Sequence, residues 1–341
     1  MEKTVSAVYV CSARGHSGSP SRSSLFGMNG GILNSPEKST QQRGLSMPMQ
    51  PIHLKERAVI EIAGADARAY LHSLVTQDIM NLPAGQTCWA ALLTPQGKIL
   101  FDFFIHALSG EGNEERFLLD APASRRDALI TRMTMYRLRR QVTITPREDL
   151  AVAVDLAEDA APGGAIVYAD PRYAEMGTRA FLPQEAAANF AEDATAWHAR
   201  RIALGLPDSD GDIGSQKLFP HEANFDCLNG VSFTKGCYVG QEVVSRMQHR
   251  TTVRNRLLPV LADAPLRTGM VITGAEKRMG EISSTADERA IALIRLDRAA
   301  TALENGEPLK TEEGISIRIT LPPWICFELP DPIRRTAQEA R

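Results

Sequence analysis

One stretch of the chain reads Gly230-Val231-Ser232-Phe233-Thr234-Lys235-Gly236-Cys237-Tyr238-Val239-Gly240-Gln241-Glu242 and continues to Arg246. It places an ammonium, a thiol, an aromatic ring, an amide, a carboxylate and a guanidinium close together along the backbone. Its glycines keep that backbone open, because glycine is favoured where a chain needs a positive φ or a close approach. A core strand or a surface helix gains nothing from this arrangement, which therefore predicts a turn that contacts a ligand.

Cys237 is the candidate reactive group of this stretch. A free cysteine is most often only a small buried hydrophobe. Here Lys235 lies close by, and residues 239–248 read as a short helix; a cation and a helix N-terminus both lower the pKa of a thiol. We therefore expect Cys237, assisted by Lys235, to act as a nucleophile or a metal ligand, whereas His249 is too far along the helix to be assigned as its base.

The rest of the motif consists of Gly236, Tyr238, Gly240, Gln241, Glu242 and Arg246. The amide of Gln241 suits hydrogen bonding to the edge of a heterocyclic ligand. Glu242 and Arg246 have the i, i+4 spacing of an ordinary surface ion pair.

Beyond them, the run formed by Arg246, His249, Arg250, Arg254 and Arg256 contains no acid. It is either a solvated basic segment or a site that attracts a polyanion, such as a polyglutamate chain or nucleic-acid phosphates.

Composition narrows the class of protein. With 341 residues, 43% of them hydrophobic and 23% charged, the chain has room for two or three ordinary globular domains. Its net charge of −3 argues against direct DNA binding over a broad surface. No run approaches the roughly 18 apolar residues that a membrane span needs, so no membrane association is expected.

The cysteines predict free thiols in a reducing compartment. There are five, widely spaced and without a CxxC pair, namely Cys11, Cys88, Cys227, Cys237 and Cys326. This pattern speaks against a disulfide framework and against a cysteine-only zinc site. The histidines have no metal-ligand spacing, so no metal site is predicted. Because free thiols are typical of a reducing compartment, the expected location is the cytoplasm.

Residues 1–48 differ from the rest. They are rich in serine and glycine and lack apolar periodicity, which predicts a disordered extension. The alternative is a mis-assigned start, with Met47 or Met49 as the first residue. The excess of basic over acidic residues also weakly resembles an organellar transit peptide, which would place the protein in the mitochondrial matrix.

The remaining pattern predicts an α+β fold in three parts. A first α+β unit over 49–148 has strands at 58–62, 87–93, 98–107, 116–120 and 141–145, with helices at 124–138 and after a capping Asp66. The tetrapeptide Thr94-Pro95-Gln96-Gly97 predicts a hairpin turn. A second unit over 149–250 has strands at 151–156, 165–169 and 178–182 and one long helix over 184–204.

The third part is predicted to be a small antiparallel β-barrel over 251–325. Short strands at 256–261, 269–273, 280–284, 290–295 and 315–321 are separated by Gly, Pro and Asp, without a helical segment of any length. Residues 326–341 look like a tail.

The motif 235–242, with Arg246, resembles the signature of the YgfZ family. Further segments that resemble this family are 70–78, 93–98 with Asp102, and 170–172, so that the resemblance spans roughly 50–325. It implies a folate-binding protein that supports iron–sulfur cluster assembly and repair, with eukaryotic relatives in mitochondria. The implied partners are iron–sulfur assembly proteins and client iron–sulfur enzymes.

The family is similar in turn to the aminomethyltransferase (T-protein) of the glycine cleavage system. This implies two ferredoxin-like α+β units and a barrel around a pocket for tetrahydrofolate or a one-carbon or polyglutamyl derivative. The resemblance places Asp102, Arg201, Glu222 and Asn224 in that pocket. Carboxylates accept hydrogen bonds from pterin N–H groups, and an arginine pairs with the glutamate tail.

Three functions follow as hypotheses. The first is a tetrahydrofolate-binding factor for iron–sulfur cluster assembly, maintenance or repair. The second is a folate-dependent aminomethyl or one-carbon transferase; the tyrosine-glycine-glutamate segment of the true transferase is missing, which leaves enzymatic turnover open. The third is a scaffold that docks assembly proteins and needs no ligand.

Overall fold

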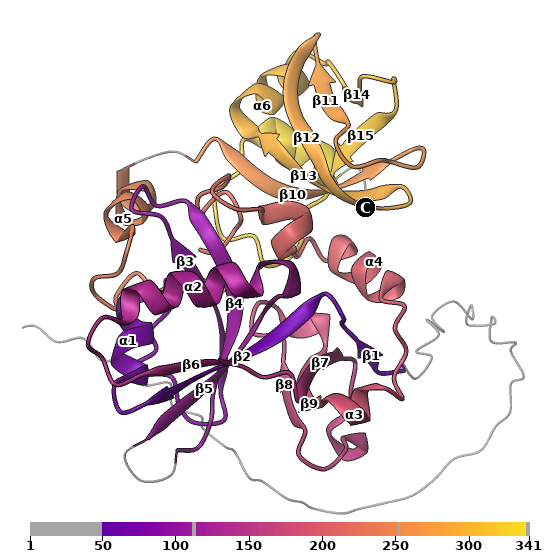
Figure 1. The fold of residues 1–341 in the computed structure, drawn as a ribbon. Helices are drawn as coiled ribbons and strands as arrows, with labels where there is room; N and C mark the ends of the chain where they lie inside the picture. The colour runs from indigo at the N-terminus through magenta and orange to yellow at the C-terminus, as the bar shows by residue number, and fades with distance from the viewer. Residues whose placement is uncertain (1–49, 111–113, 251–252, 339–341) are drawn as a thin grey trace, which may run out of the picture. The chain divides into compact units, whose positions relative to one another are not determined.

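The computed structural model describes residues 50–110, 114–250 and 253–338 (Figure 1). The expected extension 1–48, with its alternative start sites, lies outside these residues. Among the described residues, no helix is long and apolar enough to cross a bilayer.

The first α+β layer is a sheet of five described strands in the order β3-β4-β5-β2-β6. The strands are β2 (Arg57–Gly64), β3 (Thr87–Leu93), β4 (Ile99–Ala107), β5 (Glu115–Pro122) and β6 (Thr143–Pro146). Helices α1 (Ala67–Leu74) and α2 (Arg126–Arg137) cover it; α2 follows a short 3-10 turn, η1 (Ala123–Arg125). Strand β4 is buried on both faces, with Phe103 in the core under the helices and Phe104 in the core toward the second sheet.

Two local predictions in this layer have different outcomes. The hairpin is confirmed: β3 pairs with β4, and the Gly97 N–H donates to the Thr94 carbonyl across 2.8 Å. The predicted cap of α1 is wrong in its chemistry. The Asp66 carboxylate makes no capping bond and instead accepts the backbone N–H of Gln141 at 2.7 Å, because the chain before β6 passes beside it.

The second layer is a sheet of four described strands in the order β1-β7-β9-β8. They are β1 (Ile52–His53), β7 (Leu150–Val154), β8 (Ile166–Ala169) and β9 (Thr178–Pro183), followed by α3 (Gln184–Ala187) and α4 (Thr195–Ala203). Short 3-10 turns, η2 (Glu158–Ala160) and η3 (Ala174–Met176), connect these strands. Strand β1 precedes the first layer in sequence but pairs with β7 of the second.

The single long helix expected over 184–204 is wrong. The chain leaves helical geometry between α3 and α4, where the Ala191 carbonyl accepts the His53 N–H at 2.8 Å. The Ala191 N–H in turn donates to the Pro51 carbonyl at 3.1 Å. These backbone groups satisfy their hydrogen bonds with the β1 segment, which replaces the helical bonds at this point.

A buried ion-pair cluster joins the two layers. Asp120 of β5 accepts from Arg57 of β2 at 2.5 Å and from Arg179 of β9. All three side chains are buried. Although burial alone raises it, the charges of Arg179 and Arg57 hold the pKa of Asp120 below its ordinary value.

The C-terminal part is a closed antiparallel barrel, whose described strands follow the order β10-β13-β12-β11-β14-β15. They are β10 (Asn255–Ala262), β11 (Val271–Gly274), β12 (Lys277–Ala286), β13 (Arg289–Arg295), β14 (Leu309–Thr311) and β15 (Ser316–Ile319). The predicted barrel is confirmed, with β14 as an additional strand.

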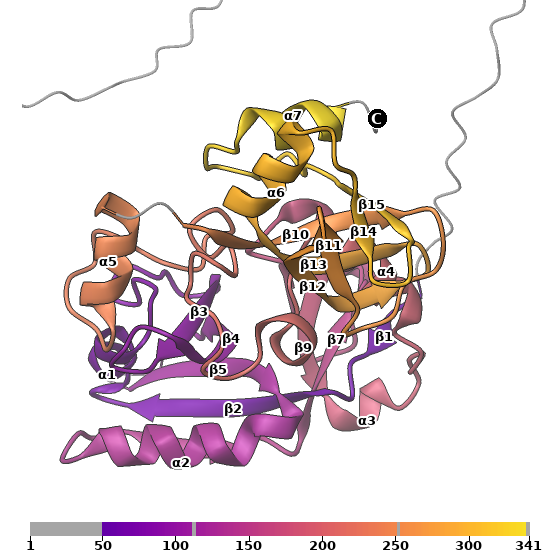
Figure 2. The same cartoon turned by 90° about the horizontal axis from the view of Figure 1, so that it is seen from above.

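Two helices that were not expected complete the barrel. Helix α6 (Leu296–Glu304) buries Leu296, Ala299 and Ala302, and α7 (Asp331–Gln338) buries Ile333 and Ala337. They lie side by side against the barrel core (Figure 2). The expectations of a helix-free barrel and of a C-terminal tail are therefore wrong here, because tertiary burial stabilises helices too short to be read from propensity.

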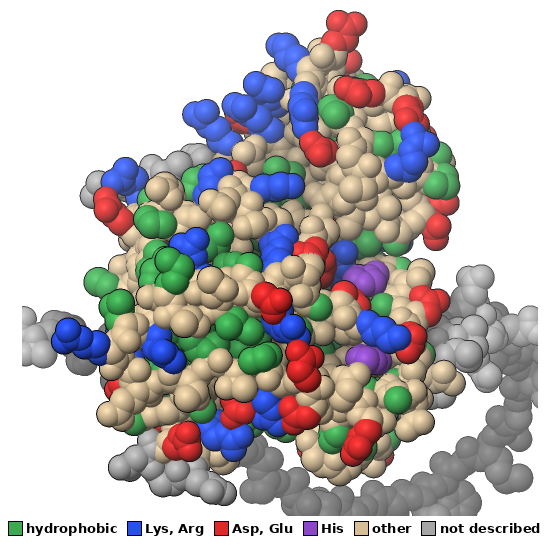
Figure 3. All heavy atoms as spheres, viewed as in Figure 1, with side chains coloured by type: hydrophobic (Ala, Val, Ile, Leu, Met, Phe, Trp, Pro, Cys, Tyr) green, Lys and Arg blue, Asp and Glu red, His purple; other side chains and the backbone are tan. Residues whose placement is uncertain are grey.

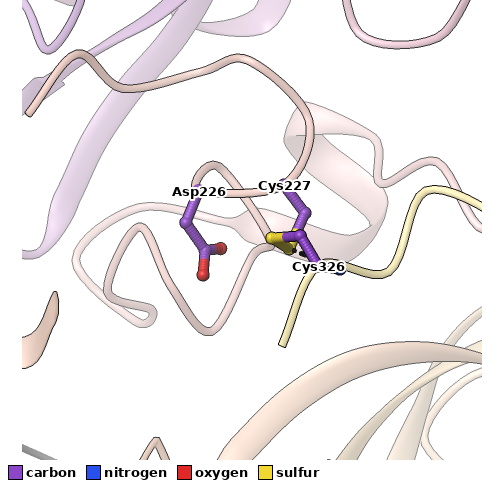
Figure 4. Close-up of side chains that lie close together, drawn as sticks. All are labelled: Asp226, Cys227 and Cys326. Carbon is purple, nitrogen blue, oxygen red and sulfur yellow. Dashed lines mark hydrogen bonds between the residues drawn. A yellow bond between two sulfur atoms is a disulfide. The ribbon is translucent and has the colours of Figure 1, made fainter. Parts of the chain in front are cut away.

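The expectation of free cysteines is wrong for two of the described thiols. Cys227 and Cys326 form a disulfide, with Cα atoms 5.4 Å apart and 99 residues between them (Figure 4). Cys88 is free and buried, and Cys237 is free and exposed. Sequence spacing carries no information about a pair that only the folded chain brings together.

Candidate functional site

The motif loop, residues 230–240, leads into helix α5 (Gln241–Arg250) and is tied to helix α1 by Lys235. The Lys235 ammonium donates to the backbone carbonyls of His72, of Val75 at 2.6 Å and of Gln77 at 2.9 Å. The last carbonyls of a helix have no partner within it. The three hydrogens of the ammonium therefore hold the motif loop against the C-terminus of α1.

This contact leaves the ammonium partly desolvated. Burial lowers the pKa of Lys235 to about 8, against the opposing influence of Asp78 and Cys88. The ammonium also lies 5.0 Å from the centre of the buried Tyr238 ring. The predicted action of Lys235 on Cys237 stays a prediction, whereas its hydrogen bonds give it a clear anchoring role.

Cys237 lies on the exposed side of the same loop. The preceding Gly236 has φ of +94°, and a Cβ added there would meet nothing within 4 Å. Gly236 is thus needed for its backbone conformation and not for lack of space. The loop presents a thiol to the surroundings while its neighbours are anchored to the protein.

The other end of the loop packs against the β3–β4 hairpin. A Cβ added to Gly240 would lie 2.6 Å from the Thr94 carbonyl oxygen, and one added to Gly97 would lie 2.8 Å from the Val243 Cβ. Two motifs that are far apart in the sequence, 94–97 and 235–242, therefore form one contact surface. Glycine at both positions permits this close approach.

Helix α5 carries the remaining motif residues on its surface. Arg246 donates to Glu242 at 2.9 Å, and the two side chains are 62% and 86% exposed, so this is the ordinary surface pair. Gln241 is half-buried at the start of the helix; its role toward a ligand stays a prediction.

The arginine run does not form one surface. Arg256 is buried and paired with Asp226 at 2.7 Å, whereas Arg254 is exposed. Exposed basic side chains gather instead on the barrel beside α6 (Figure 3), among them Arg278 and Arg298, next to the half-buried Arg295.

Asp102 of β4 is the buried carboxylate of the predicted ligand set. Its Oδ2 accepts from Trp89 Nε1 at 3.2 Å and from Ser209 Oγ at 2.9 Å. Its Oδ1 is buried without a hydrogen-bond partner among the described residues. Burial raises the pKa of Asp102, with Arg57 acting in the opposite direction.

Arg201 of α4 reaches the same turn as Asp102. Its guanidinium donates to Asp212 at 2.8 Å, and Asp212 in turn accepts from Ser284 of the barrel at 2.6 Å. Ser209 and Asp212 both belong to a π-helical turn, η4 (Ser209–Ile213). This turn connects Asp102 and Arg201 with the barrel.

Glu222 and Asn224 make their contacts elsewhere. Glu222 accepts from the Phe219 N–H at 3.0 Å and from Asn255 at 2.9 Å. Asn224 has φ of +60° and donates to the Leu257 carbonyl at 2.6 Å. Both side chains hold strand β10 onto the segment before the motif, and no bond of theirs reaches η4.

Sequence reasoning missed Ser209 and Asp212. The run Asp208-Ser209-Asp210-Gly211-Asp212 was a usable signal, since such residues favour turns that bond their own backbone. As a test of fit to a folate, the four predicted contacts give a partial answer. Only Asp102 keeps a buried oxygen without a described partner, while Arg201, Glu222 and Asn224 are engaged within the protein.

Comparisons with known proteins match the C-terminal barrel by itself and the fold of most of the chain. Residues 254–327 match the family model of the CAF17 C-terminal beta-barrel domain. The fold resembles aminomethyltransferase T of the glycine cleavage system from Bartonella henselae, with a TM-score of 0.65 and 17% identity over 81% of this chain and 86% of that one. The predicted T-protein-like fold is thereby confirmed.

Two curated relatives share most of their length with the chain. The mitochondrial iron–sulfur cluster assembly factor IBA57 of Homo sapiens is 29% identical over 302 residues, covering 80% of this chain and 84% of the relative. The factor of Mus musculus is 30% identical over 305 residues with the same coverage. The predicted kinship with iron–sulfur assembly proteins is confirmed, and the chain belongs to the family of the iron–sulfur cluster assembly factor IBA57.

Proposed function

We propose that this protein is an iron–sulfur cluster assembly factor that presents the Cys237 thiol to its partner proteins. The observation that carries this proposal is the 30% identity over 84% of the mouse factor, together with a free exposed thiol on an anchored loop. Thiolates are the usual ligands of iron–sulfur clusters, so such a loop suits contact with a cluster or with an assembly protein that holds one. The partners are other assembly proteins and client iron–sulfur enzymes.

The proposed location is the mitochondrial matrix. The relatives are named as mitochondrial, and the cytoplasm expected from composition finds no support among them. Fractionation of cells that express the full chain tests this point.

Tetrahydrofolate is the proposed ligand of the region around Asp102. When bound, it supplies a reduced pterin whose ring N–H groups need acceptors, and Asp102 Oδ1 is a buried acceptor without a described partner. Arg201 would hold the turn η4 in place through Asp212 rather than bind the glutamate tail directly. Calorimetry with tetrahydrofolate should give binding that Asp102→Asn weakens at least tenfold; no heat with the wild type would contradict this ligand.

The role of the thiol is tested by complementation. In cells depleted of their own assembly factor, the wild-type protein should restore the activity of iron–sulfur enzymes, and Cys237→Ser should fail at equal protein level. Thr234→Ala, an exposed substitution on the same loop, is the matched control and should restore activity. Full restoration by Cys237→Ser would exclude the thiol from the function.

The fold also supports a second candidate, a folate-dependent transferase, because the aminomethyltransferase has the same architecture. Purified protein given an aminomethyl donor and tetrahydrofolate distinguishes the two. Formation of methylenetetrahydrofolate would favour the transferase, and binding without turnover would favour the assembly factor.

A further inference from the structure

The disulfide Cys227–Cys326 lies at a cavity that the proposed function does not use. Cys326 is exposed and lines a cavity of about 430 Å³ together with His221, Asp226, Gln248, Arg256 and Phe327. This volume lies within the range of about 300–1,000 Å³ that small-molecule sites occupy. Figure 4 shows the Asp226 carboxylate next to the two sulfur atoms.

The charge at this cavity is balanced. The Asp226 carboxylate accepts hydrogen bonds from both terminal nitrogens of Arg256, at 2.7 and 2.8 Å. The Arg256 guanidinium also lies 3.9 Å from the centre of the Phe327 ring, directly after Cys326. Because Asp226 is already paired, the three potential ligands Asp226, Cys227 and Cys326 do not favour a metal cation.

Two side chains that line the cavity each carry a buried polar atom without a partner among the described residues. These atoms are Nε of Arg256 and Nδ1 of His221, on side chains that are 3% and 1% exposed. Arg256 Nε is a donor. His221 Nε2 lies 2.9 Å from Gln248 Oε1, which can only accept, so Nε2 carries the proton and Nδ1 is an acceptor.

A ligand that satisfies both atoms needs an acceptor for Arg256 and a donor for His221. A peptide group offers both, as a C=O and an N–H. Burial lowers the pKa of His221, which keeps the ring neutral and Nδ1 free to accept.

We propose that this cavity binds a small thiol peptide that exchanges with the Cys227–Cys326 disulfide. The ligand thiolate attacks the sulfur of the exposed residue Cys326, the bond to Cys227 breaks, and Cys227 leaves as a thiolate. A second ligand thiolate attacks the mixed disulfide and releases Cys326. Two ligand thiols thus become one ligand disulfide, their two electrons reduce the protein disulfide, and their two protons pass to the cysteine thiolates.

Exchange changes a long-range link without removing the other contacts of the C-terminal segment. The disulfide joins the segment before the motif loop to the segment that leads into α7. Two other contacts hold this segment without involving the sulfur atoms: Trp324 donates to the Leu204 carbonyl at 2.8 Å, and the Phe327 ring contacts Arg256. A disulfide in a reducing compartment is most often redox-active, in line with this exchange.

The first test incubates the disulfide-bonded wild-type protein with glutathione, a tripeptide thiol. The mixture of reduced and oxidised glutathione is set to the reduction potential of a reducing compartment. Differential alkylation and mass spectrometry should find Cys227 and Cys326 reduced. A pair that stays oxidised behaves as a structural disulfide and overturns the proposal.

The second test measures recognition of the peptide group. In Cys227→Ser, oxidised glutathione should modify Cys326, and the exposed Cys237 of the same molecule is the internal reference. The ratio of Cys326 to Cys237 adducts should be at least about tenfold higher with oxidised glutathione than with hydroxyethyl disulfide, which has no amide, because a single well-placed hydrogen bond already gives a factor of this size. Equal ratios for the two reagents would overturn peptide recognition.

Discussion

The motif loop around Cys237 and the turn η4 beside Asp102 both hold charged side chains that are partly or fully removed from water, but they stabilise these charges in different ways. In the motif loop the Lys235 ammonium is satisfied by three backbone carbonyls, and the thiol next to it stays exposed. Around η4, buried charged side chains pair with one another, as Arg201 of α4 does with Asp212 of the turn. The loop therefore exposes one reactive thiol on an anchored backbone, whereas the turn is buried and its stability depends on each of its charged partners.

This difference predicts that the buried charges near the turn control stability more strongly than the loop does. Asp120→Asn removes the carboxylate that Arg57 and Arg179 share. Leaving buried guanidinium groups without their partner costs about 3–5 kcal/mol, which urea unfolding measures. Asp297→Asn is the matched control, since its exposed pair with Arg295 contributes less than about 1 kcal/mol. Equal effects of the two variants would break the comparison.

The anchor of the loop should have an intermediate effect. Lys235→Met keeps the length of the side chain but leaves the carbonyls of Val75 and Gln77 without this donor. We expect a loss of about 1–3 kcal/mol in the free energy of unfolding, because these acceptors lose their bonds in a half-buried place. Arg246→Met, on the exposed side of α5, should change it by less than about 0.5 kcal/mol. A neutral Lys235→Met would show that the loop needs no anchor.

The two glycines of the loop allow a finer comparison. Gly240→Ala places a Cβ 2.6 Å from the Thr94 carbonyl oxygen, whereas Gly236→Ala meets open space at a similar positive φ. Gly236→Ala should cost about 1 kcal/mol for its backbone conformation, and Gly240→Ala about 1–2 kcal/mol more for the clash. Thermal unfolding of the two variants in parallel measures the difference. If Gly236→Ala were the more destabilising, the close packing on the hairpin would be refuted.

Acid should act on the ion-pair cluster and not on the loop. The folded-state pKa of Asp120 is lower than its unfolded value of about 3.9, so its stabilisation is present above that value and is lost as pH falls through the folded pKa. The wild type should therefore lose up to about 1.4 kcal/mol per pH unit in this range relative to Asp120→Asn. If the free energy of unfolding of the two proteins fell in parallel with pH, the acid sensitivity could not be assigned to Asp120.

Local structure could be predicted from the sequence where neighbouring residues alone determine it. The hairpin turn 94–97 follows from proline and glycine at fixed places, and the barrel from short strands between turn residues. The long helix over 184–204 failed because a competing strand, β1, takes the backbone bonds of Ala191. Helices α6 and α7 were missed because their stability comes from burying Leu296 and Ile333 against the barrel.

The sequence alone therefore determined the α+β and barrel classes and marked Cys237 as an unusual thiol, since spacing and residue type act over a few positions. The tertiary structure decided which groups meet. It placed Lys235 on the end of α1, assigned Glu222 and Asn224 to strand β10, and joined Cys227 to Cys326 across 99 residues. Contacts between distant segments depend on how whole layers pack, and no local pattern records that arrangement.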